Sequence, residues 1–238
     1  MKIVISQSMY FPWVGLLEQI KLSDIFVHYD DVQFTRGFYN RVQVKNSKGI
    51  QWLTVPLQAH HRATNIDKVL VDNSRDWREE HRKLLTQCYR STPYFSDMMS
   101  VFDEAHSTNA TTLSDVSRNS IISLVRYFGL EEGRRFICSS SLNVPGRSSE
   151  RLVAICGKLQ ASTYVTGHGA RNYLDHELFE SSGVKVEYLN YLKMSYPQAN
   201  GDFTPQVSAL DLITNCGRDG AKFICSGTTS WKEFVNGT

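Results

Sequence analysis

Short apolar runs alternate with amphipathic stretches at the start of this chain. Lys2 to Ser6 and Ile25 to Tyr29 are rich in β-branched or aromatic residues, which is typical of buried strands. Apolar residues between Val14 and Ile20 follow helical spacing, and Pro12 suits the first turn of a helix because it has no N–H to leave unpaired. The pattern predicts a strand, a helix and a second strand, with the two strands parallel.

A different pattern follows Arg41. Apolar and polar residues alternate from Val42 to Lys45, a turn is expected over Asn46–Gly49, and Gln51 to Val55 returns as a partner strand. This alternation predicts an antiparallel hairpin. The polar segment from Gln58 to Asn65 has no periodicity and is expected to be a loop. Ile66 to Val71 is predicted to be another strand.

Three helices without intervening strands are predicted next. The first begins behind the capping sequence Asn73–Asp76 and has apolar residues at spacings of three and four up to Cys88. The second runs from Tyr94 to about His106, and the third runs from Thr112 to Phe128. We expect these helices to form a helical subdomain at about 74–129.

The alternation of strands and helices then resumes. Strands are predicted at Arg135–Cys138, Thr163–Thr166 and Val184–Leu189, and helices at Ser149–Leu159, Tyr173–Ser181 and Ser208–Thr214. The tail from Ser226 to Thr238 has few core residues, although Trp231 and Phe234 could dock on the rest. The predicted fold is therefore α/β. It has a Rossmann-like, mostly parallel sheet with an inserted antiparallel hairpin and the helical subdomain, in a single domain over 1–238.

Composition narrows the class of protein. The chain has 238 residues, 41% hydrophobic and 21% charged, as in a soluble globular protein. A net charge of +2 gives no field that would favour DNA. Its five cysteines include no CxxC pair, which argues against a disulfide framework and a zinc knuckle. Without a secretion signal or a long apolar run, a cytoplasmic protein with no membrane partner is expected.

Polar side chains gather where the first two predicted strands end. Parallel strands end at one edge of the sheet, so Gln7, Tyr10, Asp30 and Gln33 are expected together at the edge where open α/β sheets bind ligands. Asp30 and Asp31, beside Asn40–Arg41, could hold a sugar hydroxyl, an amine or a metal. The alternative is a turn closed by a salt bridge.

Two later turns are expected at the same edge. Ser139–Ser141 and Thr166–Gly169 follow strands and precede helices, where small residues and free N–H groups suit a phosphate. Neither turn is a Walker A loop or a GxGxxG motif. The central expectation is that the loops with Gln7, Asp30 and Gly167 surround one pocket.

The histidines and cysteines have competing interpretations. His81 lies on the apolar stripe of its helix, where it is either a core residue or a general base that titrates near neutral pH. His60 and His61 are adjacent and have no further ligand nearby, so a solvated loop is favoured over a metal site. No GxSxG elbow supports serine catalysis, and Cys138 and Cys216 are interpreted as structural thiols.

The chain resembles the WbqC-like protein family. The resemblance begins with QSMYFPWVGLLEQIKLSDIFVHYDDVQF, followed by Asn40–Arg41, and extends over roughly the whole chain. Further similar blocks are Gln51–Pro56, Trp77 with His81, Tyr164–Gly167 with Tyr173–Leu174, Tyr196–Gln198, Phe203, Ser208, Asp211–Leu212 and Asn215. The family often has a proline where this chain has His168.

Family members occur among genes for bacterial surface polysaccharides, so the resemblance implies work on an activated sugar. It suggests a transferase that places an aminoacyl group such as glycyl, or an acyl group, on the amine of a nucleotide-linked 4-amino-4,6-dideoxy sugar in O-antigen (lipopolysaccharide) or capsule biosynthesis. His81 or Asp30 would then be the base, and N–H groups around Gly167 would bind pyrophosphate or an oxyanion. Tyr10 and Trp13 would stack on a base or a sugar ring. The remaining candidate substrate-binding residues are Gln7, Gln33, Asn40, Arg41, Ser139, His168, Tyr173 and Gln198.

Two alternatives stay open. The N-terminal unit resembles the start of nucleotidylyltransferase-type folds, but Phe11–Gly15 has neither histidine of their HxGH motif. An ATP-dependent ligase or a nucleotidyltransferase relative of the same pathway is therefore one alternative, and a non-catalytic subunit that binds sugar nucleotides is the other. No cofactor signature is present. An aminoacyl-tRNA donor has no support from the charge, and the donor and the oligomeric state stay open.

Overall fold

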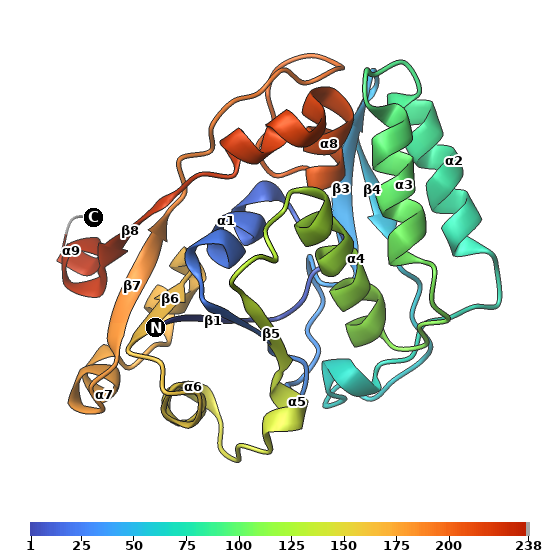
Figure 1. The fold of residues 1–238 in the computed structure, drawn as a ribbon. Coiled ribbons are helices and arrows are strands. Elements are labelled where there is room, and N and C mark those ends of the chain that lie inside the picture. The colour runs from blue at the N-terminus through green and yellow to red at the C-terminus, as the bar shows by residue number, and fades with distance from the viewer. Residues whose placement is uncertain (237–238) are drawn as a thin grey trace.

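A six-stranded sheet forms the centre of the computed structural model, which describes residues 1–236 (Figure 1). The strands lie in the order β5–β2–β1–β6–β7–β8, and all neighbours are parallel except β7 and β8. Numbered by their succession in the chain, they follow the order 3-2-1-4-5-6 of Rossmann folds. Their bounds are Lys2–Ser6 (β1), Ile25–His28 (β2), Arg135–Cys138 (β5), Thr163–Thr166 (β6), Lys185–Asn190 (β7) and Gly227–Ser230 (β8). The predicted α/β class and mostly parallel sheet are confirmed.

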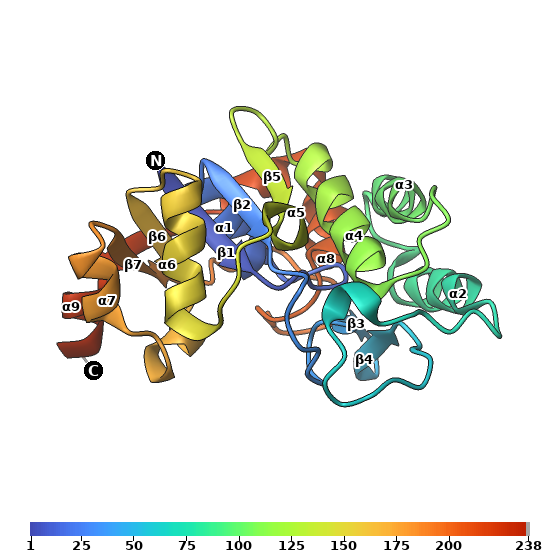
Figure 2. The same cartoon turned by 90° about the horizontal axis from the view of Figure 1, so that it is seen from below.

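Helices cover both faces of this sheet (Figures 1 and 2). Val4 and Phe26 pack in one apolar cluster with residues of α1 (Val14–Leu22) and α8 (Ala209–Cys216). Their neighbours along the strands, including Ile3 and Ile25, point the other way and pack with residues of α6 (Ser148–Lys158) and α7 (His176–Ser181). Because both faces are buried, β1 and β2 read as continuous apolar runs rather than as alternating strands.

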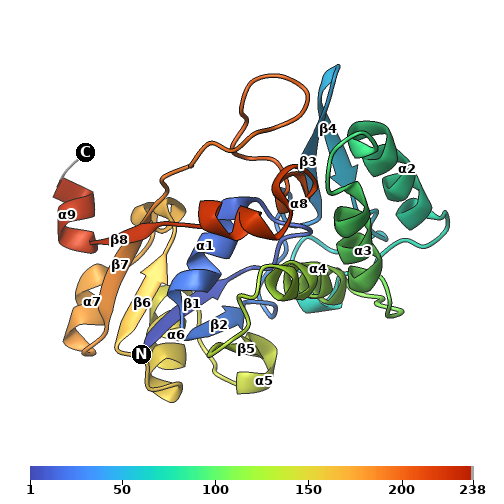
Figure 3. The same cartoon turned by 45° about the horizontal axis from the view of Figure 1, so that its top comes forward.

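The hairpin and three consecutive helices lie beside the sheet (Figure 3). Strands β3 (Arg41–Asn46) and β4 (Gly49–Thr54) form the predicted antiparallel pair. Helices α2 (Trp77–Tyr89), α3 (Phe95–Ala105) and α4 (Leu113–Tyr127) follow, and Asp76 and Thr112 cap the first and the third. Their apolar side chains belong to the same cluster as those of α1 and α8. No helix in the described part of the chain is both long and apolar enough to cross a bilayer.

The predicted strand at Ile66–Val71 is wrong. The chain forms a 3₁₀ turn, η1 (Ile66–Lys68), followed by isolated bridges at Leu70 and Val71. Ile66 and Val69, three residues apart, point together into a small cluster with Phe34. This spacing of three belongs to a turn rather than to a strand.

The helix predicted to begin at Tyr173 begins three residues later. Tyr173 ends a second 3₁₀ segment, η2 (His168–Asn172), and the side chain of Asp175 caps α7 by accepting from the N–H of Leu178. The polar sequence 168–172 makes the turn, and the cap fixes where the helix starts.

The tail is better ordered than its apolar content suggests. β8 pairs with β7, and α9 (Trp231–Asn236) follows it. Phe234 stacks on Tyr188 with ring centroids 4.2 Å apart, and Trp231 stacks on His176 at 4.6 Å. Residues 237–238 of the predicted tail lie outside the described residues. The other bounds are Ser139–Leu142 (α5) and Gly217–Phe223 (η3).

A buried polar network holds the long loop between β7 and α8. The Asp211 carboxylate, fully buried in α8, accepts hydrogen bonds from the hydroxyls of Tyr89 at 2.9 Å and Tyr196 at 3.0 Å. Gln198 donates to the Tyr196 hydroxyl, and its amide oxygen accepts from the buried ammonium of Lys45. The network ties the loop to β3 and α2. Burial raises the pKa of Asp211 to about 6.

Replacing Asp211 tests this network. Asp211→Ala leaves the two buried tyrosine hydroxyls without their acceptor, and we expect the free energy of unfolding to fall by about 3 kcal/mol. Urea denaturation measures the change. Asp219→Ala, which removes an exposed carboxylate from η3, is the matched control and should change stability by less than about 0.5 kcal/mol. Equal effects of the two substitutions would show that the network does not stabilise the fold.

Candidate active site

The candidate site lies where β1 and β6 separate. These strands pair through Lys2–Thr163 and Ile3–Tyr164, whereas β1 and β2 pair along four residues. The carboxyl ends of β1 and β6, Ser6 and Thr166, line one cavity of about 790 Å³. This gap between the first and fourth strands in chain order is the switch point at which open α/β sheets bind ligands. The loops after β1, β2 and β6 meet there, as parallel strands require.

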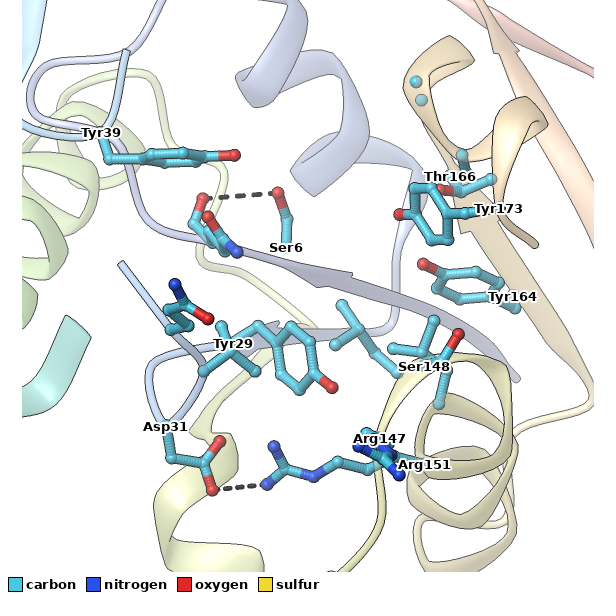
Figure 4. Close-up of a pocket in the computed structure, with 18 of the residues that line it drawn as sticks. Ser6, Tyr29, Asp31, Tyr39, Arg147, Ser148, Arg151, Tyr164, Thr166 and Tyr173 are labelled. Atoms are coloured by element: carbon cyan, nitrogen blue, oxygen red, sulfur yellow. Dashed lines mark hydrogen bonds and ion pairs between the residues drawn. The ribbon is translucent and has the colours of Figure 1, made fainter. Parts of the chain in front are cut away.

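Four tyrosines give the cavity its polar character. Tyr29, Tyr39, Tyr164 and Tyr173 line it, and Figure 4 shows their hydroxyls directed toward the same space from different elements. Burial raises the pKa of Tyr29, Tyr39 and Tyr164, so these phenols are neutral at physiological pH. Neutral phenols both donate and accept hydrogen bonds, which suits sugar hydroxyls and amides.

An ion pair closes one side of the cavity (Figure 4). A guanidinium nitrogen of Arg151, in α6, lies 2.5 Å from a carboxylate oxygen of Asp31, directly after β2. The side chain of Arg151 is only 8% exposed, and that of Asp31 is 21% exposed. The other oxygen of Asp31 accepts from the Ser139 hydroxyl. Asp31 therefore faces the cavity as a carboxylate fixed from two sides.

The start of α6 forms a second polar wall. Gly146, Arg147 and Ser148 line the cavity, and no side chain caps the helix. Arg147 is exposed and has no ion-pair partner among residues 1–236. Ser148 adopts a φ of +51°, a left-handed conformation that is uncommon for residues other than glycine. Free N–H groups beside an unpaired guanidinium form a wall suited to an anion.

A neighbouring cavity extends the basic surface. It has a volume of about 500 Å³ and shares Gln33 with the main cavity. Arg36, His60 and Arg62 also line it, and both arginines lack an ion-pair partner in the described part of the chain. The amide nitrogen of Gln33 donates to the Arg62 carbonyl and so joins the two loops.

Asp30, a predicted catalytic residue, has a different environment from Asp31. It is 4% exposed, and its carboxylate accepts from the backbone N–H of Ser140 at 3.0 Å and from the Ser140 hydroxyl at 2.9 Å. The Ser139 hydroxyl, a predicted substrate contact, is also within 3.0 Å of it. Asp30 and Ser139 thus fasten the end of β2 to the start of α5, behind the cavity wall. The arginine beside these carboxylates is Arg151, whereas the sequence suggested Arg41.

His81, the second predicted catalytic residue, lies in the core outside the cavity. Its Nδ1 is 3.0 Å from the hydroxyl of the fully buried Tyr10, and its Nε2 is 3.2 Å from the Thr54 carbonyl. The Tyr10 hydroxyl also contacts His106, and Trp77 packs against all three rings. Burial lowers the pKa values of His81 and His106 to about 4, so both rings are neutral at pH 7.

The other predicted site residues divide into two sets. Gln7, Gln33, Gly167 and Tyr173 line the main cavity, where the side-chain oxygen of Gln7 is buried and has no hydrogen-bond partner within residues 1–236. The second set lies elsewhere: Trp13 and Arg41 line a separate cavity, Asn40 donates to the Val55 carbonyl, His168 contacts the Leu189 carbonyl, and Gln198 belongs to the Asp211 network.

Comparison with known sequences identifies the family. A sequence model of the WbqC-like protein family matches residues 7–223, which include every residue named above as facing the main cavity except Ser6. This chain belongs to the WbqC-like protein family. An uncharacterized protein of Mycobacterium tuberculosis, Rv1507c, is 33% identical to it over 231 residues, which cover 94% of this chain and 97% of that protein. No solved structure matches.

Several residues of this WbqC-like cavity were missed by sequence reasoning. Tyr29 and Tyr164 lie within strand-like runs. Arg147 lies just before a predicted helix and Arg151 in its first turn, where charge usually means solvent exposure. The available signal was position, because Tyr29 directly follows β2 and Arg147 follows a proline–glycine turn. Within residues 1–236 no three His, Cys, Asp or Glu side chains are grouped to bind a metal.

Gly167 permits a close contact at the cavity wall. A Cβ at this position would lie 2.8 Å from the Tyr191 hydroxyl, which accepts a hydrogen bond from Gln19 at 2.8 Å. Gly167→Ala should therefore displace Tyr191 and weaken binding of a ligand in this cavity by about fivefold to tenfold, measured by calorimetry. Adding Tyr191→Phe removes the clashing hydroxyl and should restore affinity. Gly157→Ala in α6, where the added Cβ meets nothing within 4 Å, is the control. No rescue by the double substitution would contradict this account of the wall.

The buried histidines make stability depend on pH. The folded pKa of His81 is about 4, below the usual 6.5, so its stabilising contribution is fully present above pH 6.5 and is lost as the pH falls toward 4. His81→Asn removes this titration. On acidification over that window, the wild type should lose up to about 3 kcal/mol more unfolding free energy than the variant. Urea denaturation at several pH values measures the difference. If the unfolding free energy of the wild type and of His81→Asn changed equally with pH, the lowered pKa would not belong to His81.

Proposed function

We propose that this protein binds a nucleotide-linked amino sugar in the main cavity and transfers an aminoacyl or acyl group to its amine. The observation behind this proposal is the combination found at the switch point of the sheet: a large cavity, an uncapped helix start with an unpaired arginine, and inward-facing tyrosines. Membership of the WbqC-like family supports the same substrate class.

The diphosphate of the ligand would lie at the start of α6. The N–H groups of Ser148 and its neighbours supply donors, and Arg147 supplies a charge that no carboxylate of the described chain neutralises. Arg151 is already paired with Asp31, so the Asp31 carboxylate largely neutralises its charge. Arg36 and Arg62, in the adjoining cavity, extend the attraction to an anion beyond this point.

The sugar would lie against the tyrosines. A deoxysugar presents a methyl group and ring carbons to aromatic faces, and its hydroxyls to phenol oxygens and amides. Gln7 is well placed to bind the polar groups of the sugar. Its buried side-chain oxygen has no hydrogen-bond donor in the described chain, and a sugar hydroxyl or ammonium group can supply one.

Asp31 is the group suited to the transfer step. The amine nitrogen attacks the acyl carbon, the new C–N bond forms as the bond to the leaving group breaks, and the nitrogen releases a proton. Asp31 would accept a hydrogen bond from the neutral substrate amine beforehand and receive that proton, while the leaving group departs with the electron pair of the broken bond. Asp31 lines the cavity, whereas Asp30 and His81 do not. Asp31 is therefore the proton acceptor in this proposal.

A mass assay tests the reaction. Purified protein is incubated with a dTDP-linked 4-amino-4,6-dideoxy sugar and one donor at a time: ATP with glycine, glycyl-tRNA or an acyl-CoA. One donor should increase the mass of the sugar nucleotide by one acyl group, and Asp31→Asn should reduce the rate by about 100-fold. If the sugar nucleotide binds but no donor gives a product, the result would favour a non-catalytic sugar-nucleotide-binding subunit over a transferase. Pyrophosphate release without acyl transfer would instead indicate a nucleotidyltransferase.

A binding comparison tests the phosphate site separately. Arg147→Ala should weaken binding of the dTDP-sugar by about tenfold, because it removes a charge-assisted hydrogen bond to phosphate. Arg90→Ala is the matched control, since Arg90 is exposed at the end of α2 and lines none of the cavities described above. Calorimetry in low salt measures both. Equal affinities for the two variants would remove Arg147 from the site.

A further inference from the structure

A smaller cavity, separate from the two described above as basic, adjoins the main one at Met9. It has a volume of about 180 Å³ and shares only Met9 with the main cavity. Its walls come from three segments far apart in the sequence: the loop after β1, the start of β3 with the residues before it, and the chain just before α8. The residues that matter below are Met9, Pro12, Trp13, Phe38, Arg41 and Gln206.

The walls of this cavity are rigidly held. Phe11, between Met9 and Trp13, is fully buried and has a φ of +40°, which is a strained value for a bulky side chain. The Ser120 hydroxyl accepts from its N–H at 2.8 Å, and the Ser208 hydroxyl donates to its carbonyl at 2.9 Å. The N–H of Ala209 donates to the Pro12 carbonyl at 2.8 Å. These bonds fix the loop that presents Met9 and Trp13.

The exposed groups of the cavity are aromatic, with one cation. Phe38 is 49% exposed, although apolar residues of this size are usually covered. The Arg41 guanidinium lies 4.5 Å from the centre of the Trp52 ring, which holds it in place, and it has no hydrogen-bond acceptor or ion-pair partner within residues 1–236. Gln206 adds an exposed amide.

We infer that this cavity binds a nucleobase, with the ring stacked on the aromatic side chains and its acceptor atoms facing Arg41 and Gln206. The walls are apolar and the polar groups are confined to the edge, which is the arrangement that a planar heteroaromatic ring requires. A fatty chain would leave the guanidinium and the amide unpaired, and a bare phosphate would gain nothing from Trp13 and Phe38.

The inference rests on the proposed function for the identity of the nucleotide. Because the cavity adjoins the main one across Met9, it suits either the base of the sugar nucleotide bound there or the base of a nucleotide-bearing acyl donor. The two sources share the same chemistry and differ in the base, thymine or adenine, which a titration can distinguish.

Calorimetry with the full chain tests the inference, with thymidine 5′-monophosphate, adenosine 5′-monophosphate and ribose 5-phosphate as probes. At least one nucleotide should bind about tenfold more tightly than ribose 5-phosphate, because only the nucleotides bring a base to stack. Tighter binding of the thymidine nucleotide assigns the cavity to the sugar nucleotide. Tighter binding of the adenosine nucleotide assigns it to the donor, and equal binding indicates stacking without selection.

Two exposed side chains can be removed without disturbing the core. Phe38→Ala and Arg41→Ala should each weaken nucleotide binding by about fivefold to tenfold and leave ribose 5-phosphate binding unchanged. Leu70→Ala is the matched control, since Leu70 is 45% exposed and lines neither cavity. Nucleotide binding no tighter than that of ribose 5-phosphate, or unchanged nucleotide binding in Phe38→Ala, overturns the inference.

The failure of this inference can be told apart from failure of the proposed function. If nucleotides bind more tightly than ribose 5-phosphate but no acyl transfer occurs, the transferase proposal is rejected and the nucleobase cavity is retained. If acyl transfer occurs and Phe38→Ala does not change the KM for either nucleotide substrate, the nucleobase cavity is rejected and the transferase proposal is retained.

Discussion

The separation of β1 from β6 is the constraint on which the site depends. Two parallel strands that stayed paired to their ends would bring Ser6 and Thr166 side by side and fill the space with backbone. Here the pairing stops after Ile3 and Tyr164, and the sheet opens at its carboxyl edge. The reversal of strand order requires the chain to leave β1 toward one side and β6 toward the other, so no connection crosses the gap.

Polar contacts keep this gap from collapsing. Arg151 reaches from α6 to Asp31 after β2, and Ser139 joins Asp31 and Asp30 to the start of α5. Breaking one partner of such a nearly buried ion pair leaves a charge without compensation, which costs far more than a surface pair would. The pair therefore fixes the position of the carboxylate that the proposed reaction uses. The Arg151–Asp31 contact therefore both supports the fold and positions a group of the proposed reaction.

The two polar clusters outside the cavity have another role. Tyr10, His81 and His106 form one cluster beneath α2 and α3, and Asp211 with its tyrosines forms the other beneath the long loop before α8. Each places specific hydrogen bonds inside an apolar region, where an unmatched partner is costly. Such clusters select one packing of the helices on the hairpin. That packing supports the loop after β1, which presents Gln7 to the main cavity and Trp13 to the smaller one.

Most of the strand and helix pattern, the α/β class and the edge of the sheet at which the main cavity lies could be predicted from the residues alone. This was possible because buried strands, amphipathic helices and caps have local signatures, and because parallel strands must end together. The sequence did not separate Asp30 from Asp31, which are adjacent residues with different partners, and it placed His81 among catalytic candidates although its ring faces the core. The position of Arg147 and Arg151 at the cavity follows from the folded chain alone. The contact of Arg151 with Asp31, for example, joins residues about 120 apart in the chain and leaves no trace in local spacing. The tertiary structure also decided that the tail becomes part of the sheet, because backbone pairing there does not require apolar side chains.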